Sequence, residues 1–427
     1  MTGKLAENLF EELRWRGLIH NLTEGAGEVL AKEKITAYIG FDPTADSLHI
    51  GSLLPIMVLV HLQRHGHVPI ALAGGGTGMI GDPSGRTKER QLLTDDILAH
   101  NLAGIKGQLA YFLAFDGVPN PARLVNNADW LLKLNLIEFL RDTGKYFTVN
   151  YMLAKDSVRM RLESEEGISF TEFSYMLLQA YDFFRLYQDH GCTFQMGGSD
   201  QWGNITAGAE LVRKLSEGKA HALTVPLVMS STGVKFGKSV DGAIWLDPAR
   251  TSPFRFFQYW INTADGDVIK YLKYFTLLDQ EEIAVLEQSL AAEPHLRAAQ
   301  TRLAEEVTRN VHGEDGLRKA REATGVLFGG AMQGMSADDL LDIFAEVPSS
   351  AAPEGALSQG IGIVDLALHC GLETSKKQAR TLIESGGLYL NGNRIDSLDC
   401  VVTQADAIDG RVIVLRKGKK GYHLLRA

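Results

Sequence analysis

Cysteine is scarce in this chain of 427 residues, and its three copies are scattered. An odd number without CxxC spacing argues against a disulfide framework or a zinc site, so we expect inert, buried thiols at Cys192, Cys370 and Cys400. No apolar run reaches membrane-spanning length, and the N-terminus lacks the basic and apolar regions of a signal peptide. These absences predict a cytoplasmic protein that does not act in a membrane.

Positive charge is not in excess. The formal net charge is -9, which argues against a protein coated with basic side chains for nonspecific binding to DNA. The end of the chain differs, because from Gly360 onward 10 Lys and Arg stand against 7 Asp and Glu. This asymmetry places any contact with RNA mainly in the C-terminal segment.

The length predicts two or three domains, and the composition of 45% hydrophobic and 22% charged residues is ordinary for a globular protein. Strand-like and helix-like segments alternate through the first half, which indicates βαβ units in a parallel sheet. We expect strands at 35–41, 68–73, 123–126, 193–196 and 223–229, and helices at 53–62, 95–115, 130–142, 149–163, 171–188 and 201–216.

The predicted fold class is α/β, with a Rossmann-like parallel-sheet domain, an all-helical domain and a small α+β domain. The first spans residues 1–248 and the second 249–346. A linker rich in Ser, Pro, Ala and Gly follows at 347–359. In the last domain, 360–427, we expect helices at 363–369 and 376–385, strands at 388–390 and 412–415, and a hairpin turn at Asn391-Gly392.

Two short motifs, far apart in the sequence, suggest a site that activates a nucleotide. His49-Ile50-Gly51-Ser52 falls where a strand turns into a helix, so an imidazole and exposed amide N–H groups meet an anion there. Lys235-Phe236-Gly237-Lys238-Ser239 supplies two ammonium groups on a later loop. Groups already in place stabilise the charge that moves during phosphoryl transfer.

A third pattern is a polar stripe on a helix. Tyr175, Gln179 and Asp182 are spaced i, i+4, i+7 and therefore share one face. Because apolar residues such as Met176 and Phe183 flank them, this face is expected to line a cavity. The alternative is an amphipathic helix with its polar side in water.

Other motifs have weaker interpretations. Gly76 to Gly81 matches the GxGxxG of dinucleotide-binding enzymes, but the acidic pair at Asp95 and Asp96 begins a predicted helix where an acidic strand end is required. Gly237-Lys238-Ser239 resembles the end of a P-loop, although the earlier glycine is replaced by Thr232. His61 and His65 are spaced to share a metal but lack HExxH, and we expect them to face solvent.

Taken together, these motifs resemble bacterial tyrosyl-tRNA synthetases over essentially the whole chain. The segments that carry the resemblance are Tyr38 to Thr44, His49 to Ser52, Gly81-Asp82-Pro83-Ser84, the stripe Tyr175/Gln179/Asp182, Gly197 to Asn204 and Lys235 to Ser239. The family motif ends in a second histidine where this chain has Ser52, whose hydroxyl is shorter and uncharged.

The resemblance implies formation of tyrosyl-adenylate from L-tyrosine and ATP, transfer of the tyrosyl group to its tRNA, Mg²⁺ accompanying ATP, and a homodimer. No dedicated protein metal site is expected. The implied tyrosine-binding residues are Tyr38 and Asp182 at the phenolic hydroxyl, Tyr175, Gln179 and Asp82 at the ammonium, and Gln201 near the carboxyl. The implied catalytic residues are Thr44, His49, Lys235 and Lys238, with assistance from Arg86 or Arg90. The implied ATP-binding residues are Gly40, Asp42, His49, Gly51, Ser52, Gly198, Asp200 and Lys238.

The last segment resembles a small RNA-binding domain of a ribosomal small-subunit protein. Ser375 to Arg380 and Gly386 to Gly392 carry this resemblance, and it implies that Lys376, Lys377 and Arg380 bind RNA, with Lys417, Lys419 and Lys420 as further phosphate contacts. Two rival functions stay open. One is an RNA chaperone or splicing factor that has lost activation, and the other is an enzyme that adenylates or cytidylates a different small molecule.

Overall fold

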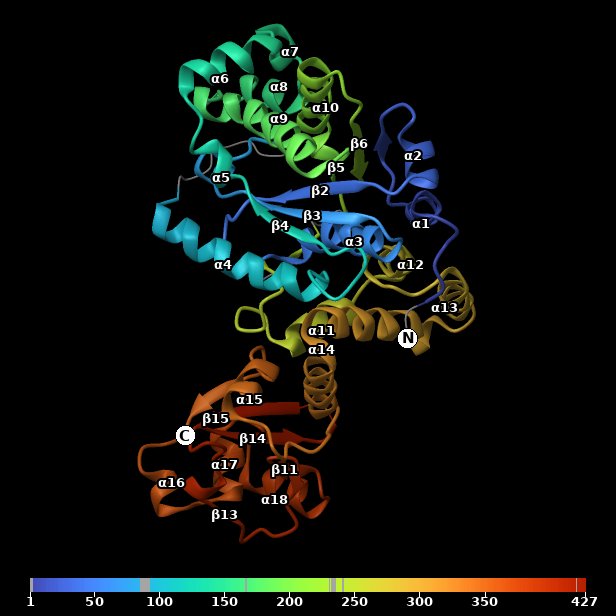
Figure 1. Ribbon diagram of the computed structural model, residues 1–427. Coiled ribbons are helices and arrows are strands. Elements are labelled where there is room, and N and C mark those ends of the chain that lie inside the picture. Colours follow the sequence, from blue (N-terminus) through green and yellow to red (C-terminus); the bar gives the residue numbers. More distant parts are fainter. Residues whose placement is uncertain are drawn as a thin grey trace. The chain divides into compact units, whose positions relative to one another are not determined.

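The computed structural model describes residues 3–84, 93–165, 167–229, 231, 236–239, 242–419 and 421–427. The chain forms two compact units (Figure 1). The first contains Met1–Arg250 and Asn262–Val311, and the second contains Thr251–Ile261 and His312–Ala427. We expected residues 249–346 to form a separate helical domain, whereas these two units each contain part of that segment. That the segment folds by itself stays a prediction.

A six-stranded sheet forms the core of the first unit, in the order β1-β6-β5-β2-β3-β4. Five strands are parallel, and β1 pairs antiparallel to β6. The strand β3 is buried at all positions but its first, as expected for a parallel strand covered on both faces. The strands are β1 (Asn21–Leu22), β2 (Thr36–Phe41), β3 (Val68–Ala73), β4 (Arg123–Asn126), β5 (Phe194–Gly198) and β6 (His221–Val225).

Helices cover both faces of this sheet, with α3 and α4 on one side and α9 and α10 on the other (Figure 1). Because side chains alternate along a strand, Tyr38 and Leu72 point to the α9 side and pack with Phe183. The helices of this unit include α1 (Leu9–Trp15), α2 (Ala26–Lys32), α3 (Ile50–Arg64), α4 (Asp95–Phe112), α5 (Ala128–Leu131), α6 (Leu136–Asp142), α7 (Val149–Leu153), α8 (Asp156–Leu162), α9 (Phe170–His190), α10 (Trp202–Ser216), α12 (Asp265–Phe275) and α13 (Gln280–Ala292).

Local capping explains where several helices begin and end. Ser169 accepts a hydrogen bond from the Glu172 backbone N–H at the start of α9, and Gly191 ends that helix with a φ of 61°. The segment predicted as one helix at 130–142 is instead divided into α5 and α6, because the Asn135 side chain caps a new helix. The helix predicted at 149–163 is likewise divided into α7 and α8.

The order of the parallel strands creates a switch point between β2 and β5. From β2 the chain proceeds to β3 and β4 on one side, whereas β5 and β6 lie on the other. In sheets of this kind, ligands bind outside the carboxyl ends of the strands at the switch point. The segments that follow β2, β3, β4 and β5 therefore meet at one edge of the sheet.

The second unit contains a five-stranded sheet in the order β12-β11-β14-β15-β9. Asn391 and Gly392 form the predicted two-residue turn, with φ values of 47° and 83°. Sequence analysis missed β15, and the segment expected as a linker contributes β9, which pairs parallel to β15. The strands are β9 (Ser349–Ala351), β11 (Leu388–Leu390), β12 (Asn393–Arg394), β14 (Val412–Lys417) and β15 (Gly421–Arg426), with β10 (Ile361–Gly362) and β13 (Val401–Val402) forming a separate pair.

The helices of this unit pack against its sheet in two apolar clusters. They are α11 (Pro253–Ile261), α15 (Ala337–Ile343), α16 (Ala356–Gln359), α17 (Ile363–His369) and α18 (Lys376–Glu384). The long α14 (Ala298–Leu327) runs from one unit into the other and has a non-helical residue, Gly313, with a φ of 71°.

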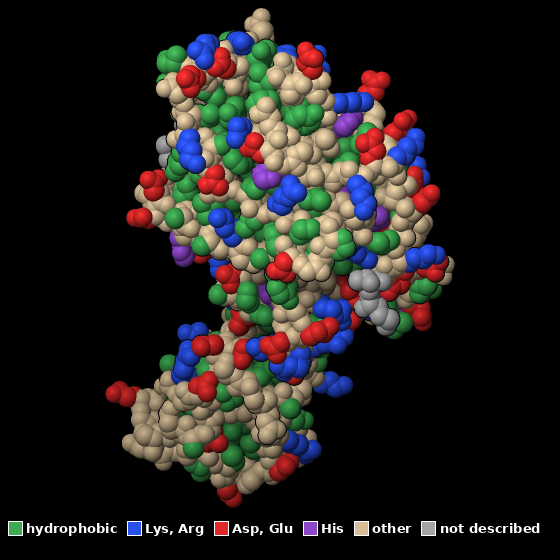
Figure 2. Space-filling view, viewed as in Figure 1, with side chains coloured by type: hydrophobic (Ala, Val, Ile, Leu, Met, Phe, Trp, Pro, Cys, Tyr) green, Lys and Arg blue, Asp and Glu red, His purple; other side chains and the backbone are tan. Residues whose placement is uncertain are grey.

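The surface and the thiols agree with the composition. Acidic and basic side chains are interspersed over the face shown in Figure 2. Among the described residues, no helix is long and apolar enough to cross a membrane. Cys192 and Cys370 are buried as predicted, whereas Cys400 is half-buried. Burial raises the pKa of the Cys370 thiol to about 11, which keeps it protonated at neutral pH.

Candidate active site

The carboxyl edge of the parallel sheet brings together most of the side chains that the sequence predicts for the tyrosine site. Tyr38 lies on β2 and Asp42 just beyond it, while Asp182 comes from α9, which covers that face. Figure 1 shows α9 crossing above β2 and β5. A site built on strand ends and one long helix is held by the rigid part of the fold.

Tyr38 and Asp182 are two deeply buried polar side chains at this edge. Their exposed fractions are 0% and 1%. The hydroxyl of Tyr38 has no hydrogen-bond partner among the described residues. Burial and then the nearby Asp182 carboxyl raise the pKa of Tyr38 well above its usual range. A buried hydroxyl without a partner, next to a carboxyl group, suits a ligand that carries a polar atom into this pocket.

Two residues that the sequence analysis missed hold the carboxyl of Asp182. The Asn127 amide donates to Oδ2 at 2.8 Å, and the Trp130 indole N–H donates to Oδ1 at 2.7 Å. Burial raises the pKa of Asp182 to about 7, although these two hydrogen bonds act to lower it. The carboxyl group is therefore fixed in orientation and titrates near neutral pH.

Asn127 is itself fixed by the loop that follows β3. The Gly76 backbone N–H donates to Asn127 Oδ1 at 2.7 Å. The side-chain amide of Asn127 also donates to Thr77 Oγ1 at 2.9 Å. The signal available in the sequence was the pair Asn126-Asn127 at the carboxyl end of a predicted strand. The glycines of the GxGxxG match serve this packing, and Asp95 begins α4 as expected, so the dinucleotide interpretation gains no support.

Asp42 links the ends of β2 and β3 to the polar stripe of α9. Thr77 Oγ1 donates to its Oδ1, and the Tyr175 hydroxyl donates to its Oδ2, both at 2.8 Å. A Cβ atom on Gly74 would lie 2.1 Å from Asp42 Oδ1, so only glycine permits this approach. Tyr175 thus faces the sheet edge and not bulk solvent.

A second hydrogen-bonded group joins Asp82, Gln179 and Gln201. Gln201 Nε2 donates to Asp82 Oδ2 at 2.7 Å, and Gln179 Nε2 donates to Gln201 Oε1 at 3.3 Å. The buried amide of Asn204, another residue not singled out from the sequence, donates to Gln179 Oε1 at 3.1 Å. The stripe Tyr175, Gln179, Asp182 therefore faces the interior and not water, and that it lines a cavity stays a prediction.

His49 stands at the start of α3. Its Nδ1 accepts the Gly51 backbone N–H at 2.9 Å, so the imidazole caps the helix. His49 and Thr44 are both exposed, as are Gly40, Gly51 and Asp200, while Ser52 and Gly198 are half-buried. Helix α3 is 15 residues long, and its accessible N-terminus offers amide N–H groups and the positive end of the helix dipole to an anion.

The lysine motif lies only partly within the described residues. Lys235 is outside them, as are Arg86, Arg90 and Lys420. The backbone of Lys238 belongs to β7 (Lys238–Ser239), which pairs with β8 (Gly242–Ala243). After β8, Trp245 forms an antiparallel bridge to His49, and their rings are 6.1 Å apart. The chain that follows the lysine motif therefore contacts the histidine motif.

The expectation for His61 and His65 was wrong. Their side chains are 0% and 5% exposed and face Glu12 of α1, because α1 packs on α3. Burial, and then Arg16, lower the pKa of His61 well below its usual value, so this imidazole is neutral. No group of three or more His, Cys, Asp or Glu side chains in the described part of the chain could hold a metal ion.

The predicted RNA-binding residues lie in the second unit. Lys376, Lys377 and Arg380 are on α18 and are all exposed. Lys376 also forms an ion pair with Asp365 at 2.7 Å. Three cations are thus exposed within the nine residues of one helix, and their binding to RNA stays a prediction.

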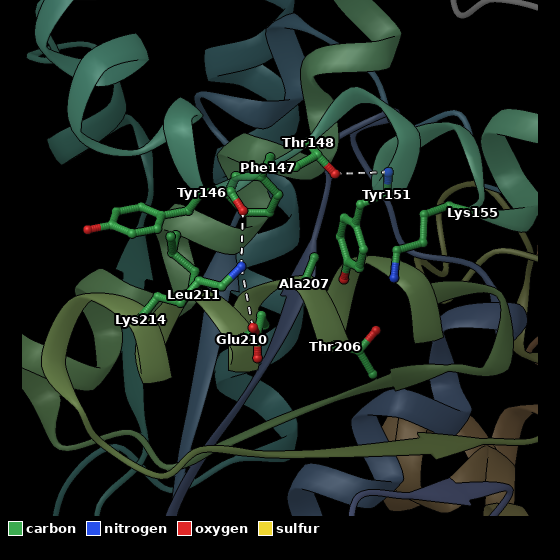
Figure 3. Close-up of a pocket in the computed structure, with 10 residues that line it drawn as sticks. All are labelled: Tyr146, Phe147, Thr148, Tyr151, Lys155, Thr206, Ala207, Glu210, Leu211 and Lys214. Carbon is green, nitrogen blue, oxygen red and sulfur yellow. Dashed lines mark hydrogen bonds and ion pairs between the residues drawn. The ribbon is translucent and has the colours of Figure 1, made fainter.

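A separate cavity of about 430 Å³ lies between α7 and α10 and contains none of the predicted site residues (Figure 3). In that view Lys214 points between the Tyr146 backbone and Glu210. Its Nζ donates to the Tyr146 carbonyl at 3.1 Å and lies 3.3 Å from Glu210 Oε1. Lys155 lies 4.0 Å from the ring centroid of Tyr151.

Comparison with known proteins agrees with this geometry. The family model for tRNA synthetases class I (W and Y) matches residues 30–329, and that for the tyrosine–tRNA ligase SYY-like C-terminal domain matches 339–425. A tyrosine–tRNA ligase of Roseiflexus castenholzii is 57% identical over 98% of this chain and 99% of its own length, and one of Bacteroides thetaiotaomicron is 50% identical over 98% and 100%. A truncated mitochondrial tyrosyl-tRNA synthetase of Aspergillus nidulans superimposes with a TM-score of 0.69 at 34% identity, covering 76% of this chain and 95% of that one. The chain therefore belongs to the class I tRNA synthetases of the tryptophan and tyrosine group.

Proposed function

We propose that this chain ligates L-tyrosine to its tRNA at the expense of ATP, the activity for which its relatives are named. In the first step a tyrosine carboxylate oxygen attacks the α-phosphorus of ATP, and pyrophosphate leaves. In the second step a hydroxyl of the terminal ribose of tRNA attacks the tyrosyl carbonyl carbon, and AMP leaves with the bonding electrons. The observation that carries the proposal is the buried Tyr38 hydroxyl beside the fixed carboxyl of Asp182.

Tyr38 and Asp182 hold the phenolic hydroxyl of the substrate. A phenylalanine ring in the same place leaves both polar groups buried without a partner, which is costly. Tyr175, Gln179 and Asp82 hold the ammonium group, and Gln201 contacts the carboxyl end. The hydrogen bonds that already join Gln201 to Asp82 and Gln179 support this assignment, because they pre-organise the acceptors.

No protein nucleophile is needed, because the attacking carboxylate is already anionic and the adenylate is already activated. Rate enhancement then comes from alignment and from stabilising phosphate charge. Thr44, His49, Lys235 and Lys238 act on the departing phosphates. Gly40, Asp42, Gly51, Ser52, Gly198 and Asp200 contact the remainder of ATP. Mg²⁺ enters with the ATP phosphates, which is its usual mode of binding in such sites.

The second unit binds the tRNA through Lys376, Lys377 and Arg380. We also propose a homodimer that works in the cytoplasm. Large apolar side chains, 38% to 69% exposed, lie on α5 to α7 and are candidates for the dimer contact: Leu132, Leu136, Ile137, Leu140, Val149 and Leu153. Large exposed apolar side chains favour burial against a partner where they form a contiguous patch. Sedimentation equilibrium of the Ile137→Asp variant should give the monomer mass, and an unchanged dimer would exclude this surface.

Exchange of labelled pyrophosphate into ATP tests the activity. We expect exchange that depends on tyrosine, is much weaker with phenylalanine and stops when Mg²⁺ is chelated. The absence of tyrosine-dependent exchange would favour the RNA chaperone alternative. Exchange driven by an unrelated acid would favour an enzyme that adenylates another small molecule.

A further inference from the structure

The residues that precede the two lysines in the sequence are hydrogen-bonded to helix α12. Asp267, in the first turn of α12, is 3% exposed. Its Oδ2 accepts two hydrogen bonds from Ser231, one from the backbone N–H and one from the hydroxyl, both at 2.8 Å. Ser231 lies four residues before Lys235 in the sequence.

Lys270 strengthens this attachment one helical turn further along. Its Nζ is 3.1 Å from Asp267 Oδ1 and donates to the Met229 backbone carbonyl at 3.0 Å. Burial acts to raise the pKa of Asp267, but the hydrogen bonds from Ser231 and Lys270 outweigh it, so the pKa is lowered. Asp267 is therefore ionised at neutral pH, and its bonds to Ser231 are charge-assisted.

The same helix also holds the interior of the lysine motif. Phe236 is 9% exposed and stacks on Phe275 with ring centroids 5.2 Å apart, and it lies 5.3 Å from Tyr271. The next residue, Gly237, has a φ of 85°, and its carbonyl accepts the Ile244 backbone N–H at 3.1 Å. Contacts with α12 thus lie on both sides of Lys235 in the sequence.

On its C-terminal side the segment is joined to the histidine motif. The Ile50 backbone N–H donates to the Ile244 carbonyl at 3.0 Å, and Leu246 N–H donates to the Leu48 carbonyl at 2.8 Å. The described residues on either side of the lysines therefore contact two elements: Ser231 and Phe236 contact helix α12, and Ile244 and Leu246 bond to the start of α3.

We propose that Asp267 is a positioning residue for adenylate formation, acting through Ser231 on the segment that contains Lys235 and Lys238. This inference rests on the proposed function, because it assigns those lysines to ATP. It predicts that loss of the Asp267 carboxylate impairs the use of ATP and leaves tyrosine binding unchanged. The simpler alternative is that Asp267 only stabilises the N-terminus of α12 by its negative charge.

The test compares Asp267→Ala and Asp267→Asn with Asp265→Asn. Asp265 is in the same first turn of α12 and is exposed, and its Oδ1 accepts a hydrogen bond from Gln300 Nε2 at 2.6 Å. Its substitution removes the same charge from the same helix end. Tyrosine-dependent pyrophosphate exchange is measured as a function of ATP and of tyrosine, and normalised to active sites by the tyrosyl-adenylate formed per chain.

For Asp267→Ala we expect kcat/KM for ATP to fall by about tenfold or more, the equivalent of one lost charge-assisted hydrogen bond. The dissociation constant for tyrosine should change by less than about twofold, a shift too small to count as a lost hydrogen bond. Asp267→Asn keeps one oxygen acceptor and should lie between Asp267→Ala and the unmodified chain. Asp265→Asn should behave like the unmodified chain.

Equal ATP kinetics in Asp267→Ala and Asp265→Asn would overturn the inference, as would a loss shared equally by ATP and tyrosine. If Asp267→Ala does not fold, two variants at exposed or half-exposed positions replace it. Ser231→Ala removes the hydroxyl bond to Asp267, and Lys270→Ala removes the contacts with Asp267 and with the Met229 carbonyl. Each variant should lower kcat/KM for ATP alone. An unchanged value in both would reject the inference. An unmodified chain without exchange would instead reject the proposed function itself.

Discussion

At the scale of the residue, the proposed role of Asp182 predicts that tyrosine binding depends on pH. Its pKa is raised to about 7 by burial, so the ionised fraction falls as the pH decreases through 7. The ionised carboxylate accepts the phenolic O–H of tyrosine more strongly than the neutral acid does. We therefore predict full tyrosine affinity above about pH 8 and a loss approaching tenfold per pH unit below about pH 6.

Tyrosine titration by intrinsic fluorescence between pH 5.5 and 8.5 measures this dependence. Asn127→Ala provides an internal check, because the Asn127 hydrogen bond acts to lower the pKa of Asp182. Removal of this hydrogen bond should raise the pH at which half of the tyrosine affinity is lost. A tyrosine affinity that is equal at pH 6 and pH 8.5 would show that Asp182 does not titrate in this range.

The selectivity of the pocket gives a second prediction at this scale. Asn127→Ala removes the amide that donates to Asp182 Oδ2 and leaves that oxygen without its buried donor. We expect tyrosine binding to weaken by about 1.5–3 kcal/mol, the usual worth of a hydrogen bond to a charged group. The preference for tyrosine over phenylalanine in kcat/KM should fall with it. Asn126→Ala is the matched control, because the Asn126 side-chain oxygen accepts the backbone N–H groups of Gly75 and Ala128, whereas Asn127 donates to Asp182.

Some of these residues could be found from the sequence and others could not. The stripe on α9 was visible because its i, i+4, i+7 spacing is local, and the bonds of Tyr175, Gln179 and Asp182 agree with it. Asn127 and Trp130 were missed because their role depends on a contact 55 and 52 residues away in the sequence. No periodicity marks an amide that acts on a distant carboxylate.

At the scale of the element, helix α1 contacts both α3 and α12. Arg16, whose side chain is 1% exposed, pairs with Glu12 at 2.7 Å. It also donates to the backbone carbonyls of Lys273, Thr276 and Leu278 at the C-terminal end of α12. Glu12 in turn lies 3.5 Å from His61 of α3. These contacts fix α12 and α3 against the same buried ion pair.

We predict that Arg16→Leu destabilises the protein by about 3–5 kcal/mol, because it leaves the buried Glu12 carboxylate without its ion-pair partner and removes one donor from each of three carbonyls. The double change Glu12→Leu with Arg16→Leu should cost less than the sum of the single changes. Urea unfolding followed by circular dichroism measures both. Arg14→Ala is the control, since the Arg14 pair with Glu11 on the same helix is exposed and worth about 0–1 kcal/mol. Additive effects of the Glu12 and Arg16 changes would contradict the coupling.

Prediction of whole elements succeeded where the signal was local. The strands at 68–73 and 123–126 have the predicted bounds because apolar runs end at turn residues. The helix expected at 130–142 failed because a side-chain cap at Asn135 overrode continuous helical spacing. The parallel pairing of β9 with β15 joins residues 75 positions apart, and nothing local in 349–351 predicts its partner.

At the scale of the whole molecule, the proposed binding sites are distributed over the two units. The polar groups proposed to bind tyrosine and ATP lie in the first unit, whereas the exposed cations of α18 lie in the second. Each function should therefore respond to substitutions in its own unit. Electrostatic contacts with phosphates have a further signature, since each adds to the dependence of binding on salt concentration.

The triple change Lys376→Ala, Lys377→Ala and Arg380→Ala tests this division. We predict weaker binding of tRNA with a salt slope lower by about two, because each lost phosphate contact to single-stranded RNA contributes about 0.7. Pyrophosphate exchange driven by tyrosine should stay unchanged, because the cations are not part of the adenylation site. The control is Arg318→Ala with Lys319→Ala, two cations of the same unit that are already paired with Asp315 and Glu322. A salt slope unaltered by the triple change would exclude α18 from RNA binding, and a loss of exchange would mean that the second unit contributes to adenylation.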